Sequence, residues 1–76
     1  MTPLKKMRIK KGLTLSGVVS LLAGKGESID TGNLSRIERG IQRPSPRLAE
    51  SIVSVFGGEL SEMHIIYPER YTGRAQ

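Results

Sequence analysis

Residues 30–40 carry the side chains of this sequence that are best suited to bind another molecule. Asp30 is a favourable helix N-cap, because its carboxylate accepts amide hydrogens that a first turn leaves unpaired, and Gly40 is typical of the position after a helix. At about 100° per residue, one stripe of this helix is apolar and consists of Leu34, Ile37 and Ile41. The opposite side is small, polar or cationic and consists of Gly32, Ser35, Arg36 and Arg39. Such a helix is suited to the major groove of DNA, although an ordinary core helix with a solvated basic face shows the same pattern.

The positive charge of the chain is concentrated in its first two thirds. The 76 residues have a formal net charge of +5. Residues 1–47 hold ten Lys or Arg against three acidic residues, a net charge of +7, whereas residues 48–76 hold two against four, a net charge of −2. The first part is therefore suited to bind an anion. We expect double-stranded DNA and not a membrane, because no expected helix has a cationic face backed by exposed Trp or Phe.

The composition argues against catalysis and metal binding. The chain has no cysteine, and its only histidine, His64, has no second histidine or cysteine with which to form a metal site. The sequence also lacks a nucleophile–base–acid set and a glycine-rich phosphate loop. We therefore expect no enzyme, no metal and no cofactor. No apolar run approaches the length of a membrane span and no signal-peptide pattern is present, so we expect a cytoplasmic protein.

Five helices are predicted from cap residues, glycine or proline stops and apolar periodicity. The predicted caps are Thr2, Thr14, Asp30, Ser45 and Ser61. The side chains predicted to form the core share the helical period: Leu4, Met7, Leu15, Val18, Val19, Leu22, Leu34, Ile37, Leu48, Ile52, Val55, Phe56 and Met63. We therefore expect an all-α fold, a compact five-helix bundle in a single domain over residues 1–71, with a flexible tail at 72–76.

The segment at about 60–71 is predicted to form a dimer contact. Ile65, Ile66 and Tyr67 are more apolar surface than so small a domain is expected to hide, so we expect them to face a second copy of the chain. Alternatively, they cover the core of a monomer. Residues 63–67 also favour a β-strand paired across the dimer, and the sequence leaves helix and strand open.

Three motifs together resemble a known family. Leu13-Thr14, the run Asn33-Leu34-Ser35-Arg36-Ile37-Glu38-Arg39-Gly40, and Arg43-Pro44-Ser45 are similar to the helix-turn-helix family of phage repressors and Cro, also called the XRE type. The resemblance spans roughly residues 4–60. It implies a lambda-repressor-like DNA-binding domain whose third helix, opening at Asp30, is the recognition helix in the major groove.

The resemblance also implies roles for individual residues. The positions at or near base edges are Thr31, Gly32, Asn33, Ser35 and Arg36. Arg36 is the first candidate for a specific contact, because a guanidinium can bond O6 and N7 of guanine together. The residues expected to bind phosphate are Lys25, Arg39, Gln42, Arg43 and Ser45. Arg8 and Glu38 occupy the positions of a structural ion pair in the family, and the helical wheel independently places Glu38 near the inner border of its helix.

Two positions depart from the family pattern. Members often have a glutamine just after the cap of the second helix, where this chain has Leu15, so that DNA contact is not expected here. The eight positions from Leu22 to Asp30 exceed the usual spacing between the second and third helices. The turn at residues 24–28 is therefore expected to be enlarged, with a geometry that the family pattern does not supply.

The combined expectation is a sequence-specific transcriptional regulator, a homodimeric repressor that binds an inverted-repeat operator. It would be encoded by a bacterium, a phage or a plasmid and would be associated with the nucleoid when bound. Two alternatives remain. An antitoxin would bind DNA and also bind a toxin as its protein partner through the acidic C-terminal half. A protein-interaction adaptor would have kept the fold without operator binding.

Overall fold

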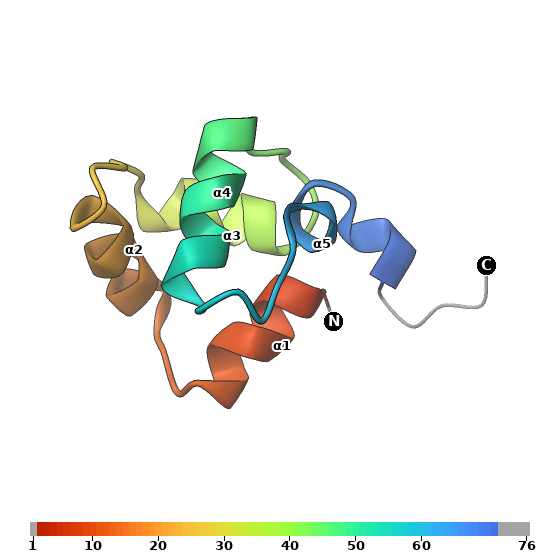
Figure 1. Cartoon of the computed structure of the whole chain (residues 1–76), viewed down its shortest axis with the longest axis horizontal. Helices are drawn as coiled ribbons and strands as arrows, with labels where there is room; N and C mark the ends of the chain where they lie inside the picture. The colour runs from red at the N-terminus through yellow and green to blue at the C-terminus, as the bar shows by residue number, and fades with distance from the viewer. Residues whose placement is uncertain (1, 72–76) are drawn as a thin grey trace.

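The computed structural model describes residues 2–71, which are helical throughout apart from their connections (Figure 1). The α-helices of this range are α1 (Pro3–Lys10), α2 (Leu15–Ala23), α3 (Thr31–Glu38), α4 (Pro46–Val55) and α5 (Glu62–Ile66), and a 3-10 helix, η1 (Pro68–Tyr71), follows them. The predicted all-α class is confirmed. Residues 63–67, for which the sequence left helix and strand open, lie in α5 and in the residue that follows it. The predicted tail at 72–76 lies outside the described residues.

The α-helices begin at the residues that the sequence predicts as caps. Each cap side chain accepts a hydrogen bond from the backbone amide three residues further along the chain, as the cap position requires. The caps are Thr2, Thr14, Asp30, Ser45 and Ser61. Pro3 and Pro46 occupy the first helical positions, where the missing amide hydrogen has no intrahelical partner to lose.

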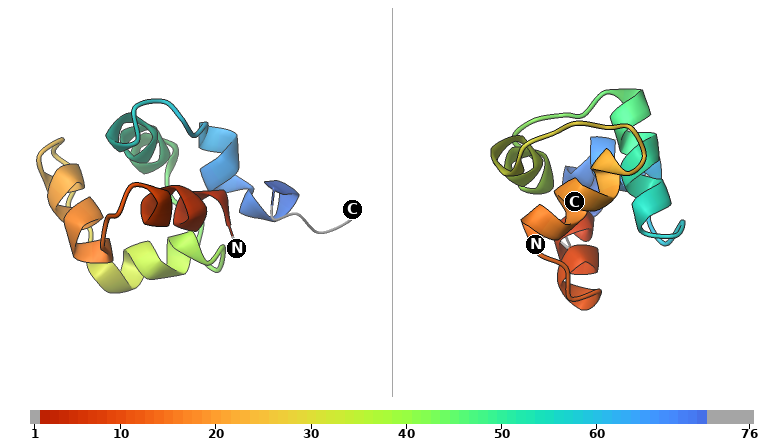
Figure 2. Two further views of the ribbon diagram at one scale, coloured as in Figure 1. Left: turned by 90° about the horizontal axis from the view of Figure 1, so that it is seen from below. Right: turned by 90° about the vertical axis from the view of Figure 1, so that its left-hand side faces the viewer.

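The helices pack around one core, to which every α-helix contributes. α2 contacts both α3 and α4, and α5 contacts α4 and α1. The buried apolar side chains are Leu4, Val18, Leu22, Leu34, Ile37, Ala49, Ile52, Phe56, Leu60 and Ile65. In both views of Figure 2, α3 lies at the edge of the molecule with one side not covered by another helix. The fold therefore uses the apolar stripe of α3 for the core and leaves its polar face accessible.

Three apolar residues lie where the sequence did not predict them. Ile41 is 66% exposed, because α3 ends at Glu38 and the left-handed backbone of Gly40 turns the chain before Ile41 can continue the stripe. Met63 was predicted to complete the core but is 40% exposed, whereas Ile65, predicted at a dimer interface, is 2% exposed. Both predictions are wrong: α5 is oriented so that Ile65 faces the core in the place expected for Met63.

The connection between α2 and α3 is long, as predicted. Residues 24–30 separate the two helices. The chain turns back immediately after α2, where the Glu27 amide donates to the Leu22 carbonyl at 2.9 Å. The Glu27 carboxylate lies 3.1 Å from the Arg47 guanidinium at the start of α4. The enlarged turn is thus tied both to the helix before it and to a helix that follows α3.

Candidate nucleic-acid interface

The C-terminal residue of α3, Glu38, is held by contacts with Thr2 and with α1. The Thr2 hydroxyl, which also caps α1, donates a hydrogen bond to the Glu38 carbonyl. The Glu38 carboxylate is buried and accepts hydrogen bonds from Nε of Arg8 at 2.5 Å and from its Nη2 at 3.1 Å. The hydrogen bond to Glu38 raises the pKa of Arg8. The same guanidinium donates from Nη1 to the Leu13 carbonyl at 2.9 Å, so one side chain connects α1, α3 and the entry to α2.

The outer face of α3 carries a hydrogen-bonded group centred on Arg36. Nη2 of Arg36 donates to Oδ1 of Asn33 at 2.7 Å, and its Nε donates to Oε1 of Gln42 at 3.2 Å. Nδ2 of Asn33 donates in turn to the Asp30 carboxylate at 3.3 Å. The backbone amide of Gln42 donates to the Arg36 carbonyl at 3.2 Å. The structure therefore brings together two residues predicted to read bases and one predicted to bind phosphate.

The remaining base-reading candidates lie around this group. Thr31 and Gly32 are exposed in the first turn of α3, and Ser35 is half-buried. A Cβ added to Gly32 would lie 3.9 Å from Nη1 of Arg36, so the guanidinium extends back over the first turn. An exposed first turn with a guanidinium above it presents donors where a recognition helix contacts base edges.

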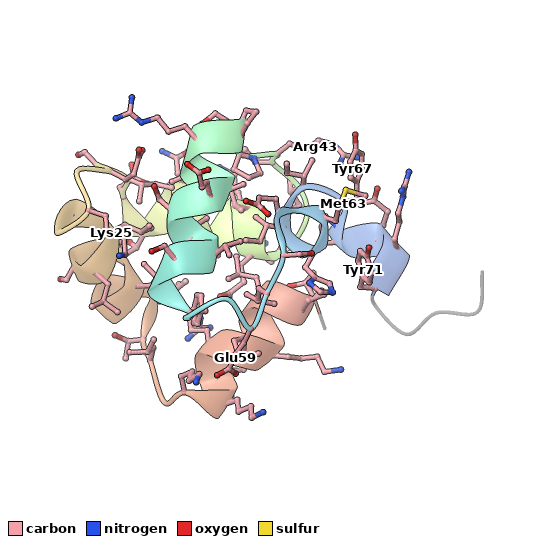
Figure 3. The ribbon with its side chains drawn as sticks, in the orientation of Figure 1. Lys25, Arg43, Glu59, Met63, Tyr67 and Tyr71 are labelled. Atoms are coloured by element: carbon pink, nitrogen blue, oxygen red, sulfur yellow. The ribbon has the colours of Figure 1, made fainter. Side chains whose placement is uncertain are left out.

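The remaining phosphate candidates are more widely spread. Arg39 is exposed at the end of α3, and Lys25 is exposed in the enlarged turn (Figure 3). The Ser45 hydroxyl is engaged as the cap of α4, 3.1 Å from the Leu48 amide. Any phosphate bound at the start of α4 would therefore meet a hydroxyl that already accepts one hydrogen bond.

Arg43 makes contacts that the sequence did not indicate. Its guanidinium donates to the Ile66 carbonyl, lies 3.4 Å from the Glu69 carboxylate and stacks 5.0 Å from the centre of the Tyr67 ring. The pKa of Glu69 is lowered, chiefly by a hydrogen bond from the backbone amide of Glu69 and to a smaller extent by the hydrogen bond from the Arg43 side chain. Figure 3 shows Arg43 and Tyr67 at the same end of the molecule. The loop after α3 is thereby joined to the C-terminal segment.

A groove of about 620 Å³ lies between α1, α5 and η1. Its apolar lining includes Met7 and Leu60, and the rings of His64 and Tyr71 meet edge to face in its wall with centroids 4.4 Å apart. Its charged lining residues are Lys6, Lys10, Arg70 and Glu59. This groove could not be predicted from the sequence, because its walls come from segments near the two ends of the chain.

Neither a metal site nor a membrane-spanning helix is present among residues 2–71. Within this range no three His, Asp or Glu side chains are grouped so as to hold a metal ion. In the same range, no helix has both the length and the apolar character needed to cross a bilayer.

Comparison with known families agrees with this geometry. A helix-turn-helix family model matches residues 4–63, which run from α1 through α2, α3 and α4 to the first two residues of α5. The chain belongs to the helix-turn-helix family of the Cro and repressor type. It is therefore a DNA-binding regulator of the XRE type, a family of regulators and not of enzymes. No curated protein and no solved structure matches the chain.

Proposed function

We propose that this helix-turn-helix protein is a dimeric repressor that binds an inverted-repeat operator through the major groove. The proposal of sequence-specific binding rests mainly on Arg36. Its guanidinium is exposed on α3 and is hydrogen-bonded to Asn33 and Gln42. A guanidinium in a defined orientation can bond O6 and N7 of guanine, whereas a freely moving cation mainly neutralises phosphate. Arg36 is therefore the central base contact of the proposed interface.

Other residues of the interface have supporting roles. Thr31, Gly32, Asn33 and Ser35 lie on the same helix, at or near the base edges around the Arg36 contact. Phosphate contacts set the register of the helix in the groove without reading sequence. The residues proposed for them are Lys25, Arg39, Gln42, Arg43 and Ser45. Arg43 would contribute charge at the phosphate backbone while it joins the loop after α3 to the C-terminal segment.

The C-terminal segment is the proposed dimer contact. Met63 and Tyr71 are 40% and 39% exposed, and Ile66 and Tyr67 are half-buried. Exposed apolar side chains gathered at one end of a small domain favour an interface with another molecule. Ile65 is excluded from this contact because it lies in the core. A two-fold dimer would place two copies of α3 about 34–36 Å apart, one turn of DNA.

Selection of binders from a pool of random duplexes at near-physiological salt tests this proposal. We expect enrichment of an inverted repeat with half-site centres about ten base pairs apart. Arg36→Ala should abolish the preference at one base position. The matched variant Arg39→Ala should instead lower the affinity for all duplexes by the same factor. Salt-sensitive binding without an enriched sequence would contradict the repressor function. Sedimentation of the protein with and without Tyr71→Asp tests the dimer contact separately.

The groove between α1, α5 and η1 favours a second candidate, an antitoxin-type regulator that also binds a protein. Its lining combines apolar side chains with three cations and one acid, so it would accept a peptide with apolar and acidic side chains. Co-expression with the product of the neighbouring gene, followed by size-exclusion chromatography, distinguishes the two. A stoichiometric complex of the two proteins would support the antitoxin function. If no complex forms, the repressor function without this partner is favoured.

A further inference from the structure

The hydrogen bonds of Arg36 leave only one end of its guanidinium open. A guanidinium has five N–H donors, spread over Nε, Nη1 and Nη2. The Nε hydrogen is donated to Gln42 and one Nη2 hydrogen to Asn33, at 3.2 and 2.7 Å. The hydrogens that remain are both of those on Nη1 and the second one on Nη2. The edge that bears Nε is therefore occupied, and the outer end, formed by the two terminal nitrogens, still has donors on both.

The two acceptors that occupy this edge are themselves fixed in place. The Asn33 amide donates to the same Asp30 carboxylate that caps the helix, and the Asn33 backbone amide donates to that carboxylate at 2.6 Å. Gln42 is placed by its backbone hydrogen bond to the Arg36 carbonyl. The N-cap of α3 and the turn after α3 thus locate the acceptors on either side of Arg36.

The same contacts orient the Asn33 side chain toward its neighbours on the helix. An asparagine recognises adenine by accepting from N6 with its carbonyl while donating to N7 with its amide. The carbonyl of Asn33 already accepts from Arg36, and the amide already donates to Asp30. Each group keeps one further lone pair or hydrogen, but the two bonds orient the Asn33 amide toward Arg36 and Asp30. Gln42 uses its side-chain carbonyl for Arg36, whereas its side-chain amide is the group that can donate to a phosphate.

Gly32 provides the space into which the open end extends. Nη1 of Arg36 lies 3.9 Å from the position of a Cβ on Gly32, so a side chain longer than alanine would compete with the guanidinium for this space. The open end consequently lies over the exposed first turn of α3, the part of a recognition helix that contacts bases.

We propose that Asn33 and Gln42 are positioning residues that present the Nη1–Nη2 end of Arg36 to a guanine. This inference rests on the proposed operator binding, changes the role of Asn33 from base contact to positioning, and adds a positioning role for Gln42. Guanine offers two acceptors, O6 and N7, in the major groove, whereas adenine offers one acceptor and one donor at the same edge. A pair of donors held in one orientation therefore binds guanine in preference to adenine. Restraint before binding also reduces the conformational freedom that Arg36 loses in the complex.

The first experiment measures discrimination on the selected operator. The guanine assigned to Arg36 is replaced by 7-deazaguanine, which lacks the N7 acceptor, and affinities are compared by fluorescence anisotropy. The wild-type protein should lose about tenfold in affinity, the equivalent of one hydrogen bond. Gln42→Ala and Asn33→Ala should bind the guanine duplex about tenfold more weakly and discriminate less between the two duplexes, because Arg36 is no longer oriented. Gln42→Glu keeps an acceptor for Nε and should keep the discrimination.

Arg39→Ala is the matched control, since Arg39 is an exposed cation of the same helix end. It should weaken both duplexes equally and leave their ratio unchanged. If Gln42→Ala and Asn33→Ala also leave the ratio unchanged while a guanine is selected, the positioning role is wrong and operator binding stands. If no sequence is selected, both the proposed function and this inference fail.

A second readout needs no DNA. In ¹⁵N NMR spectra of the free protein, the Nε–H signal of Arg36 should be displaced from that of Arg39 and should exchange with water more slowly than it, because the Arg36 hydrogen is donated to Gln42. Gln42→Ala should move it to the position of the Arg39 signal. Coincidence of the Arg36 and Arg39 signals in the wild-type protein would overturn the inference, whatever the DNA measurements give.

Discussion

Replacing Arg8 with alanine should remove a large part of the stability of this domain. The side chains of Arg8 and Glu38 are 14% and 5% exposed, and the pair makes two hydrogen bonds. Arg8→Ala would leave the Glu38 carboxylate buried without its cation and the Leu13 carbonyl without its donor. Breaking a buried pair in this way costs about 3–5 kcal/mol, and we expect the lower value, about 3 kcal/mol, because Arg8 is not fully buried.

This loss is large for a chain of this size. At about 0.05–0.15 kcal/mol per residue, 76 residues have a free energy of unfolding of about 4–11 kcal/mol. A loss of 3 kcal/mol should lower the melting midpoint by about 12–24 °C, which circular dichroism at 222 nm measures directly. Urea titration gives the same difference as a free energy, provided that the slope with denaturant is unchanged.

Lys11→Ala is the matched control. It also removes a cation of the α1 region from an ion pair, the 2.7 Å contact with Glu59, but both partners of that pair are exposed. Exposed pairs contribute less than about 1 kcal/mol, so this variant should melt close to the wild-type protein. Replacing Arg8 and Glu38 together by Met and Leu should recover much of the loss, because no unpaired charge then remains. Equal effects of Arg8→Ala and Lys11→Ala would refute the role of the buried pair in joining α1 to α3.

Two further predictions test the packing of the C-terminal segment. Ile65→Ala should lower the free energy of unfolding by about 2–5 kcal/mol, whereas Met63→Ala should change that of the monomer by less than about 0.5 kcal/mol; the reverse order in urea titrations would restore Met63 to the core. Gly40→Ala should destabilise more than Gly12→Ala, although both glycines have a left-handed φ, of +78° and +70°. A Cβ on Gly40 would lie 3.3 Å from Cγ of Pro68, whereas one on Gly12 meets nothing within 4 Å, so equal melting midpoints would contradict the contact between the turn after α3 and η1.

The features that could be predicted from the sequence are local in the chain. A cap acts on an amide three residues away, so Thr2, Thr14, Asp30, Ser45 and Ser61 identify the helix starts without knowledge of the fold. The Arg8–Glu38 pair spans 30 positions, but the helical wheel and the family resemblance both pointed to it. Glu38 is an acid at the inner border of an amphipathic helix, and such a group needs a cation if it is to be buried.

The features that could not be predicted depend on how short segments pack. α5 has only five residues, too few for apolar periodicity to determine which side faces the core. The sequence therefore predicts Met63 in the core and Ile65 at the surface, the reverse of what the structure shows. Ile41 continues the α3 stripe in sequence but follows Gly40, where the backbone leaves the helix. The contacts of Arg43 with Ile66 and Glu69 join positions more than 20 residues apart, with no pattern in the sequence to relate them.

The two faces of α3 serve different requirements, and the contacts separate them. The inner face is held at Glu38 by Thr2 and Arg8, at the start of the chain and in α1, so changes there alter the stability of the whole domain. Arg36 and its partners are bonded to one another and to the turn after α3, and their hydrogen bonds are exposed to solvent. Exposed hydrogen bonds contribute little to the free energy of unfolding but still determine the direction of a guanidinium. Substitutions around Arg36 can therefore alter what the helix recognises while Glu38 continues to hold the helix in the domain.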